Sequence, residues 1–303
     1  MNGIINIYKE KGFTSHDVVA KLRGILKQRK IGHTGTLDPD AEGVLPVCLG
    51  KATKLCDFLT DKEKEYKAVL LLGLETDTQD ISGEVLEEKS VDVSEEEVRE
   101  AVMSFVGDYS QIPPMYSALK VNGKKLYELA REGKTIERAA REVIIHNIII
   151  EDMNLPRITI RVKCSKGTYI RTLCHDIGKK LGCNGCMESL LRTQSGAFKL
   201  DGSLRLDEVE SLRDEGELEK YIYPIDGVFS DYPKVQVKKD AEKMLYNGNA
   251  MYENQLIYNC DQSILRANDI CIYDREGTFI GVYRYSEKDR QYKPVKVFLG
   301  GDK

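Results

Sequence analysis

The sequence has no apolar run long enough to cross a membrane and no secretory leader. A membrane-spanning helix needs about 18 apolar residues in succession, and Met1 to Asn6 lack the basic segment and long apolar stretch of a signal peptide. We therefore expect a cytoplasmic protein. With 303 residues the chain can bury a full core without disulfide bonds, and no segment of it repeats.

Cysteine is present but not in a pattern that completes a metal site. The eight cysteines are scattered, mostly as single residues inside apolar segments, which is typical of buried thiols in a reducing compartment. Cys183 and Cys186 form the one close pair, and their spacing suits zinc. Because no second pair completes a four-ligand set, we expect no metal.

The chain also lacks an excess of positive charge, since its formal net charge is −4. This argues against indiscriminate binding to nucleic acid. The charge is unevenly distributed, however: residues 115–142 hold seven basic and four acidic residues, whereas residues 201–220 hold three basic and eight acidic ones. The basic region could face a polyanion, and the alternative is a solvated helical face.

Hydrophobic periodicity predicts an α+β protein. The strands and helices alternate without a regular βαβ rhythm, which favours a mixed sheet over a doubly wound one. Helices are predicted after Thr14, over 52–59 and after Ser94, and the first and third of them begin with capping boxes. Strands are predicted at 65–72, 143–150 and 157–164. The last two strands are expected to pair antiparallel across a turn at 154–156.

The pattern changes near residue 230. After a possible hinge at 223–227, the chain reads as short strands with one short helix, which predicts a β-rich C-terminal module of residues 231–303. The expected strands are 235–237, 269–273, 278–285 and 295–299, and the expected helix is 241–246.

Residues 32–47 read as a structured loop that presents Asp38. Glycines and prolines set its backbone, while Leu37 and the Val44-Leu45 pair are apolar enough to hold it against a core. A carboxylate fixed in a loop is a candidate nucleophile or base. The alternative is a purely structural turn in which Asp38 caps its own backbone.

Three other segments have the character of a site. Tyr66 stands among charged residues at the start of a strand, where it could stack on a planar ligand or serve as an edge-strand core aromatic. Arg171 lies near the start of a helix that follows a strand ending at Gly167, where the helix dipole favours anions. It therefore either faces a carboxylate or phosphate or is a surface arginine. The Pro113-Pro114 step leads into the basic region and favours a lid or binding arm.

Four segments together resemble the successive motifs of the tRNA pseudouridine synthase B family, commonly called TruB. The resemblance covers residues 1–230 and implies a mixed, largely antiparallel central sheet flanked by helices, the pseudouridine synthase fold; residues 231–303 are similar to the PUA-like C-terminal module of bacterial members. The motifs are GHTGTLDPDAEG (32–43), PPMYSALK (113–120), SKGTYIR (165–171) and LLRTQSGAF (190–198).

The resemblance implies an enzyme that isomerises uridine at position 55 in the tRNA T loop to pseudouridine, without cofactor or metal. The target base would be flipped out of the RNA before reaction. Asp38 matches the catalytic aspartate and Arg171 the arginine beside it, while Tyr66, Tyr169 and Leu190 would form the base pocket with Arg171. His33 would stack into the gap left in the T loop.

The same resemblance makes residues 115–142 an arm that closes over the T stem-loop through phosphate contacts. The C-terminal module would touch the acceptor arm, and we expect a monomer. Two rival interpretations stay open: an RNA-binding protein without activity, and a nucleoside glycosidase with Asp40 or Glu42 as second carboxylate. The RNA-binding residues expected are His33, Lys120, Lys124, Lys125, Arg131 and Arg141.

Overall fold

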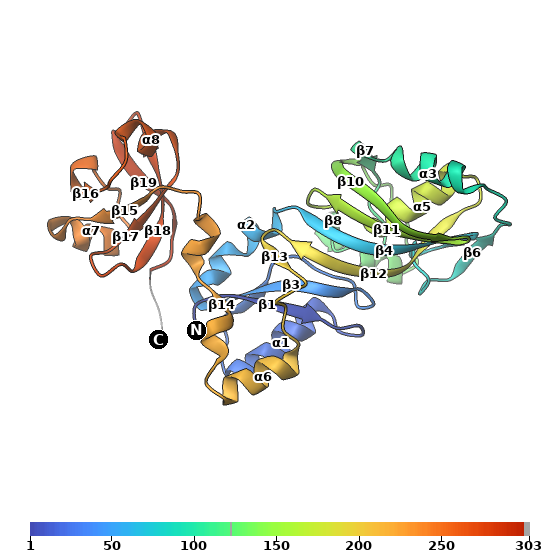
Figure 1. Cartoon of the computed structure of the whole chain (residues 1–303), viewed down its shortest axis with the longest axis horizontal. Helices are drawn as coiled ribbons and strands as arrows, with labels where there is room; N and C mark the ends of the chain where they lie inside the picture. Colours follow the sequence, from blue (N-terminus) through green and yellow to red (C-terminus); the bar gives the residue numbers. More distant parts are fainter. Residues whose placement is uncertain (122, 300–303) are drawn as a thin grey trace.

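The computed structural model describes residues 1–121 and 123–299, in which one large sheet runs through most of the molecule (Figure 1). The sheet has ten strands, and its neighbours are antiparallel except for β12 and β3. The predicted mixed, largely antiparallel sheet is thus confirmed. In order, the strands are β14 (Ile222–Tyr223), β1 (Gly3–Lys9), β3 (Glu42–Leu49), β12 (Gly185–Ser195), β4 (Lys64–Leu72), β11 (Arg157–Cys164), β10 (Arg141–Asn154) and β7 (Gly107–Gln111), with β2 (Ile31–His33) on β3 and β13 (Phe198–Lys199) on β12.

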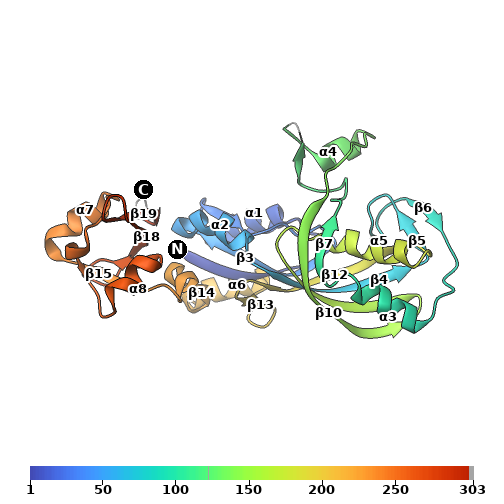
Figure 2. The ribbon, with the colours of Figure 1, turned by 90° about the horizontal axis from the view of Figure 1, so that it is seen from above.

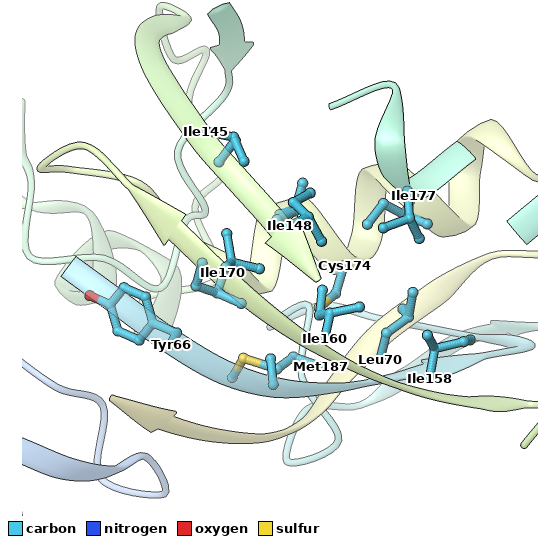
Figure 3. Packing of buried hydrophobic residues seen from close by; sticks show 14 of the residues in the cluster. Tyr66, Leu70, Ile145, Ile148, Ile158, Ile160, Ile170, Cys174, Ile177 and Met187 are labelled. Carbon is cyan, nitrogen blue, oxygen red and sulfur yellow. The ribbon is translucent and has the colours of Figure 1, made fainter. Parts of the chain in front are cut away.

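Strand β4 lies in the middle of this sheet, between β12 and β11. Its residues alternate strictly between buried and half-buried, as the period of two predicts, so Tyr66, Ala68, Leu70 and Leu72 face the core. Helices α3 (Glu95–Met103) and α5 (Ile170–Lys180) cover that face, and Figure 3 shows part of the cluster of buried side chains that the strands and α5 contribute. Of the interpretation of Tyr66 as an edge-strand core aromatic, the edge position is therefore wrong, whereas the residue does belong to the core cluster.

A second helical layer packs on the other end of the sheet. Helix α1 (Ser15–Leu26) begins with the predicted capping box, in which the Thr14 hydroxyl accepts from the Asp17 amide at 3.1 Å and the Asp17 carboxylate accepts from the Thr14 amide at 2.9 Å. Its apolar stripe and helix α6 (Leu206–Asp214) form one cluster with the inner residues of β1 and β3.

Two sequence-based assignments need correction. Residues 32–47 are not one loop, because β2 ends at His33 and β3 begins at Glu42, leaving only 34–41 between them. Pro46 argued against a strand, but β3 is buried between β1 and β12, and this tertiary burial decides its conformation. The helix predicted over 52–59 is a 3₁₀ turn, η1 (Gly50–Leu55), followed by a short helix, α2 (Cys56–Thr60).

A five-stranded sheet with its own apolar cluster occupies the C-terminal part of the chain. The four expected strands occur, although the last begins at Gln291. The structure also contains a strand, β16 (Leu256–Ile257), and a helix, α8 (Gln262–Ala267), that the sequence did not predict. The order is β16 (Leu256–Ile257), β15 (Lys234–Val237), β17 (Ile270–Tyr273), β18 (Phe279–Ser286) and β19 (Gln291–Val297), with helices α7 (Glu242–Tyr246) and α8 (Gln262–Ala267) and 3₁₀ turns η4 (Lys239–Ala241) and η5 (Glu253–Gln255).

The C-terminal sheet is packed against the body that carries the large sheet. Phe229, from the 3₁₀ turn η3 (Ile225–Phe229), has its ring centroid 5.4 Å from that of Phe58 on α2 and 6.4 Å from that of Phe298. The Lys54 ammonium also donates to the Val297 carbonyl at 2.7 Å. Apolar and polar contacts therefore fix the two sheets relative to one another.

The basic region projects from the body as an arm, and α4 (Leu126–Arg131) stands clear of the large sheet (Figure 2). The arm also contains the antiparallel pair of β8 (Lys120–Val121) and β9 (Lys124–Lys125), which lies beside α4 (Figure 2). After β4 the chain forms a second small sheet, the antiparallel pair β5 (Leu74–Thr76) and β6 (Val85–Glu88). The 3₁₀ turn η2 (Leu218–Tyr221) precedes β14. Within the described residues, no helix is long and apolar enough to cross a membrane.

Candidate active site

The loop that carries Asp38 is held by buried polar contacts. Leu37 is almost completely buried, and its amide donates to the Ser15 hydroxyl at 2.9 Å. The Lys9 ammonium, itself without exposed surface, donates to the Pro39 carbonyl at 3.0 Å. These contacts fix the backbone on both sides of Asp38, as expected for a loop that positions a functional side chain.

Arg192 anchors the same loop from strand β12. Its Nε donates to the Val44 carbonyl at 2.6 Å and its Nη2 to the Gly35 carbonyl at 3.3 Å. The side chain is 1% exposed. Neither Lys9 nor Arg192 was singled out from the sequence, because their partners are backbone carbonyls that no local pattern identifies.

Arg171 pairs with Asp38 across 133 residues of sequence. Its Nε lies 3.0 Å from Asp38 Oδ2, and its Nη2 lies 3.4 Å from Asp38 Oδ1, so the guanidinium presents one edge to both carboxylate oxygens. The Arg171 side chain is 5% exposed whereas that of Asp38 is 41% exposed. The interpretation of Arg171 as a surface arginine is therefore wrong, and the carboxylate is open to a ligand.

The remaining hydrogen-bonding capacity of Arg171 is also used. Its Nη1 donates to the Thr78 carbonyl at 3.1 Å and lies 3.4 Å from Asp80 Oδ2, while its Nη2 donates to the Tyr116 carbonyl at 2.8 Å. One buried guanidinium thus connects the loop of Asp38, the turn between β5 and β6, and the start of the arm at Tyr116. Asp80 was missed from the sequence, although its position among Thr78, Ser82 and Gly83 marks a tight turn.

The charges around Asp38 act in opposite directions. Burial raises the pKa of the Asp38 carboxyl above its ordinary value, Arg171 lowers it, and Asp80 raises it. Arg171 therefore stabilises the carboxylate anion, as expected, but its effect on the pKa is smaller than the opposing effect of desolvation. Burial also lowers the pKa of Lys9 to about 8, in spite of the opposing charges of Glu42 and Asp38.

Tyr66 lies at one end of the core cluster, with its hydroxyl directed away from the labelled aliphatic side chains in Figure 3. The ring is 9% exposed. Burial raises the pKa of the phenol, and the charge of Arg192 lowers it. The negative charge of Asp38 acts on the same phenol, which places Tyr66 near the loop.

Tyr169 and Leu190 complete this side of the site. Tyr169 precedes α5, and its amide and carbonyl pair with the side-chain amide of Gln111 at 2.8 and 2.9 Å. Burial raises the pKa of its phenol, and the charges of Arg171 and Asp38 also affect it. Leu190 is opposite Ala68 on β4 and packs against the cluster that contains Tyr66. The strand before α5 ends at Cys164 rather than at Gly167.

His33 is at the end of β2, where the loop begins. Its ring lies edge-on to that of His16, with a centroid distance of 5.1 Å, and its Nδ1 is buried with no hydrogen-bond partner among the described residues. Burial and the charges of His16 and Arg192 lower the pKa of His33 to about 4. The imidazole is therefore neutral at physiological pH.

The basic residues of the arm are exposed, apart from the half-buried Lys125, and are only weakly paired. The Lys124 side chain is 60% exposed and lies 3.6 Å from Glu132, and the Lys125 ammonium and the Arg131 guanidinium are both near the ring of Tyr127. Lys120 and Arg141 are exposed as well. Such exposed pairs contribute little to stability, so these cations can exchange their partners for a ligand.

The described part of the chain contains no group of three or more His, Cys, Asp or Glu residues placed to hold a metal ion. What the site offers is an accessible carboxylate, oriented by a buried arginine, with the buried Tyr66 and the half-buried Tyr169 close enough to be affected by its charge. That combination is typical of an enzyme that uses a positioned carboxylate at an apolar pocket.

Comparisons with known proteins define the class. A chain from an H/ACA ribonucleoprotein bound to a substrate RNA containing 2′-deoxyuridine is 26% identical, with a TM-score of 0.71 and an alignment that covers 99% of this chain and 86% of that chain. A chain from a Cbf5–Nop10–Gar1 complex is 28% identical, with a TM-score of 0.72 and coverage of 98% and 85%. The whole chain therefore has the architecture of these proteins.

Sequence comparisons are more specific. Residues 23–170 match the N-terminal domain of the TruB family of pseudouridylate synthases, and residues 171–230 match the C-terminal domain of tRNA pseudouridylate synthase B. The tRNA pseudouridine synthase B of Lachnoclostridium phytofermentans is 56% identical over 99% of this chain and 100% of its own length; that of Alkaliphilus oremlandii is 48% identical over 98% and 97%. The chain belongs to the TruB family of pseudouridylate synthases and is an enzyme.

Proposed function

We propose that the enzyme isomerises uridine at position 55 in the T loop of tRNA to pseudouridine, with Asp38 as the catalytic residue. The observation that carries the proposal is the Asp38–Arg171 pair, held edge-on at 3.0 and 3.4 Å beside Tyr66 and Tyr169. The relatives named tRNA pseudouridine synthase B, which match nearly the whole chain, support tRNA as the substrate.

The reaction conserves atoms. The bond between N1 of uracil and C1′ of ribose breaks, a bond forms between C5 and C1′, C5 loses its proton and N1 gains one. Asp38 can attack C1′, attack C6 or promote loss of the C2′ proton, and each of these routes requires the carboxylate anion. Arg171 stabilises that anion and fixes its orientation, so the carboxylate reorganises little when the substrate arrives.

The half-open geometry of Asp38 fits a base delivered from outside. A target uracil must leave the RNA loop, at a cost of a few kcal/mol in lost stacking. In our proposal it stacks on Tyr66, with Tyr169 and Leu190 as the apolar surroundings and His33 filling the gap in the T loop. A neutral His33 suits this role, because stacking between bases requires no charge.

The arm and the C-terminal sheet are proposed to bind the rest of the RNA. The exposed cations Lys120, Lys124, Arg131 and Arg141, with the half-buried Lys125, would contact phosphates of the T stem. Residues 1–230 would form the catalytic domain, and residues 231–303 a PUA-like module that touches the acceptor arm of the tRNA. We further propose that the enzyme is cytoplasmic and monomeric.

The test is tritium release from C5-tritiated uridine in a T-arm hairpin RNA. We expect release with the native enzyme, no release with Asp38→Asn despite unchanged RNA affinity, and native release with Asp40→Asn, a matched control in the same exposed loop. A hairpin with cytidine at the target position should bind without reaction.

Each rival interpretation predicts a different result. Tight binding without tritium release by the native protein would establish an RNA-binding protein without activity. Free uracil in the supernatant, abolished by Asp40→Asn or Glu42→Gln, would establish a glycosidase. Residual turnover by Asp38→Asn in a clean preparation would refute Asp38 as the catalytic residue.

A further inference from the structure

The turn of residues 76–83 is built to present two acceptors to Arg171. The Thr78 carbonyl and Asp80 Oδ2 both face Nη1 of the guanidinium. The other carboxylate oxygen, Asp80 Oδ1, accepts from the Thr78 hydroxyl at 2.8 Å and from the Ser82 amide at 3.0 Å. The Asp80 carboxylate is therefore fixed from inside the turn, and the placement of the turn decides where Arg171 points.

Gln79, between these two acceptors, has an unusual backbone. Its φ is 65°, in the left-handed region that non-glycine residues rarely adopt. The backbone is held by hydrogen bonds on both sides of the residue: its amide donates to the Thr76 carbonyl at 3.2 Å, and its carbonyl accepts from the Met187 amide at 3.0 Å. Such a conformation persists only where its surroundings hold it.

The side chain of Gln79 supplies the remaining restraint. Its Oε1 accepts from the Thr172 hydroxyl at 2.8 Å. Thr172 follows Arg171 directly on α5, is 2% exposed, and has no other hydrogen-bond partner for its hydroxyl among the described residues. Neither Gln79 nor Thr172 contacts Asp38, so any effect on the chemistry must act through Arg171.

We infer that Gln79 and Thr172 form a positioning pair, which ties the 76–83 turn to the first turn of α5 and so aims the Arg171 guanidinium at Asp38. The turn and Arg171 meet from segments about ninety residues apart, and the Thr172–Gln79 hydrogen bond closes that contact beside the ion pair. A small shift of the turn would rotate Nη1 away from its two acceptors and take Nε away from Asp38. The inference rests on the proposed function, because its readout is isomerisation.

The experiment compares Thr172→Val, which keeps the shape and removes the donor, with Thr172→Ser, which keeps the donor. Gln79→Met removes the acceptor at similar length, and Thr60→Val, a half-buried threonine on α2 whose hydroxyl donates to the Cys56 carbonyl, is the matched control. Single-turnover tritium release, hairpin affinity and thermal unfolding are measured for each variant, and the rate is followed from pH 5 to pH 9.

We expect Thr172→Val and Gln79→Met each to slow the reaction about fivefold or more, with RNA affinity unchanged. The double variant should be no slower than the slower single variant, because both remove one hydrogen bond. Thr172→Ser and Thr60→Val should react like the native enzyme. The acid limb of the rate should move to higher pH in the slowed variants, because a misdirected Arg171 stabilises the Asp38 anion less.

Native rates in both single variants would overturn the inference, as would equal losses for Thr172→Ser and Thr172→Val, which would indicate packing alone. A loss of rate with an unmoved acid limb would also contradict it. If Thr172→Val does not fold, Gln79→Met alone decides the matter. Absence of tritium release by the native enzyme would instead refute the proposed function, so the two failures are distinguishable.

Discussion

The loop of Asp38 and the arm use their cations in opposite ways. Around the loop, Lys9, Arg171 and Arg192 are at most 5% exposed, and each donates to backbone carbonyls. On the arm, Lys124 is 60% exposed and pairs at 3.6 Å with Glu132, whose side chain is itself 43% exposed. Buried cations that donate to several acceptors fix a geometry, whereas exposed cations with weak partners remain available to a polyanion.

Because of this difference, we expect substitutions in the two regions to affect different quantities: the reaction rate at the loop and the RNA affinity at the arm. A buried, fully bonded cation cannot be replaced without leaving acceptors unsatisfied, so changes there should reduce the rate of the chemical step. An exposed cation contributes through its charge, so changes there should reduce RNA affinity and its dependence on salt. Four predictions follow this contrast, from the largest effect to the smallest.

Arg171→Lys should produce the largest effect, because it tests whether geometry or charge matters at the buried site. Lysine keeps the charge but cannot face Asp38, Asp80 and two carbonyls at once. We expect the single-turnover rate to fall about 100-fold or more, since several charge-assisted hydrogen bonds are lost, with hairpin affinity nearly unchanged. A rate within threefold of native would show that the charge alone suffices, and would contradict the distinction between buried cations that act by geometry and exposed cations that act by charge.

Tyr66→Phe should have an intermediate effect. The ring that would stack on the base remains, while the hydroxyl beside Arg192 is removed. We expect the rate to fall about tenfold with base entry intact, because a proton-transfer step slows. Melting temperature is measured in parallel, since the variant also removes a polar group beside the buried Arg192. A native single-turnover rate would remove the phenol from the mechanism.

Replacing Lys124 and Lys125 by glutamine should weaken RNA binding without slowing the bound reaction. Two lost phosphate contacts should make the slope of log affinity against log salt concentration shallower by about 1.5 to 2. The charge-matched control is Lys179→Gln with Lys180→Gln on α5, where both ammonium groups have partners on the protein, Glu75 and Ser104. An unchanged slope in the arm variant would show that the arm does not meet phosphate.

His33 is at the end of β2, where the loop of Asp38 begins. Its substitution should have the smallest of the four effects, and the quantity affected is the free energy of unfolding. The pKa of His33 is about 4 in the folded protein, below its unfolded value of about 6.5. The unfolded chain therefore binds more protons below pH 6.5, and stability falls as the pH drops from there towards 4. In urea unfolding at pH 7 and pH 5, His33→Gln should lose about 1–2 kcal/mol less than the native protein over this interval.

An equal loss in the two proteins would mean that His33 titrates normally in the folded state. Since the prediction depends on burial of the ring, such a result would place His33 with the exposed cations of the arm rather than with the buried groups of the loop.

Local patterns in the sequence determined much of the fold. The capping box at Thr14, the alternation along β4 and the antiparallel pair β10 and β11 depend on hydrogen bonds and burial between near neighbours. The motifs that resemble the TruB family located Asp38 and Arg171, because residue types and their order are visible in the chain. The extent of β3 was missed, since its burial comes from strands far away in the sequence.

Tertiary structure alone decided how the site is supported. The partners of Arg171 at Thr78, Asp80 and Tyr116 lie 55 to 93 residues away, and Arg192 reaches Val44 across 148. A sequence specifies which groups can donate and accept, but only the order of strands in the sheet brings a given donor to a given carbonyl. The sequence by itself therefore determined the residue that we propose as the reacting group, and the fold determined the set of buried contacts that orients it.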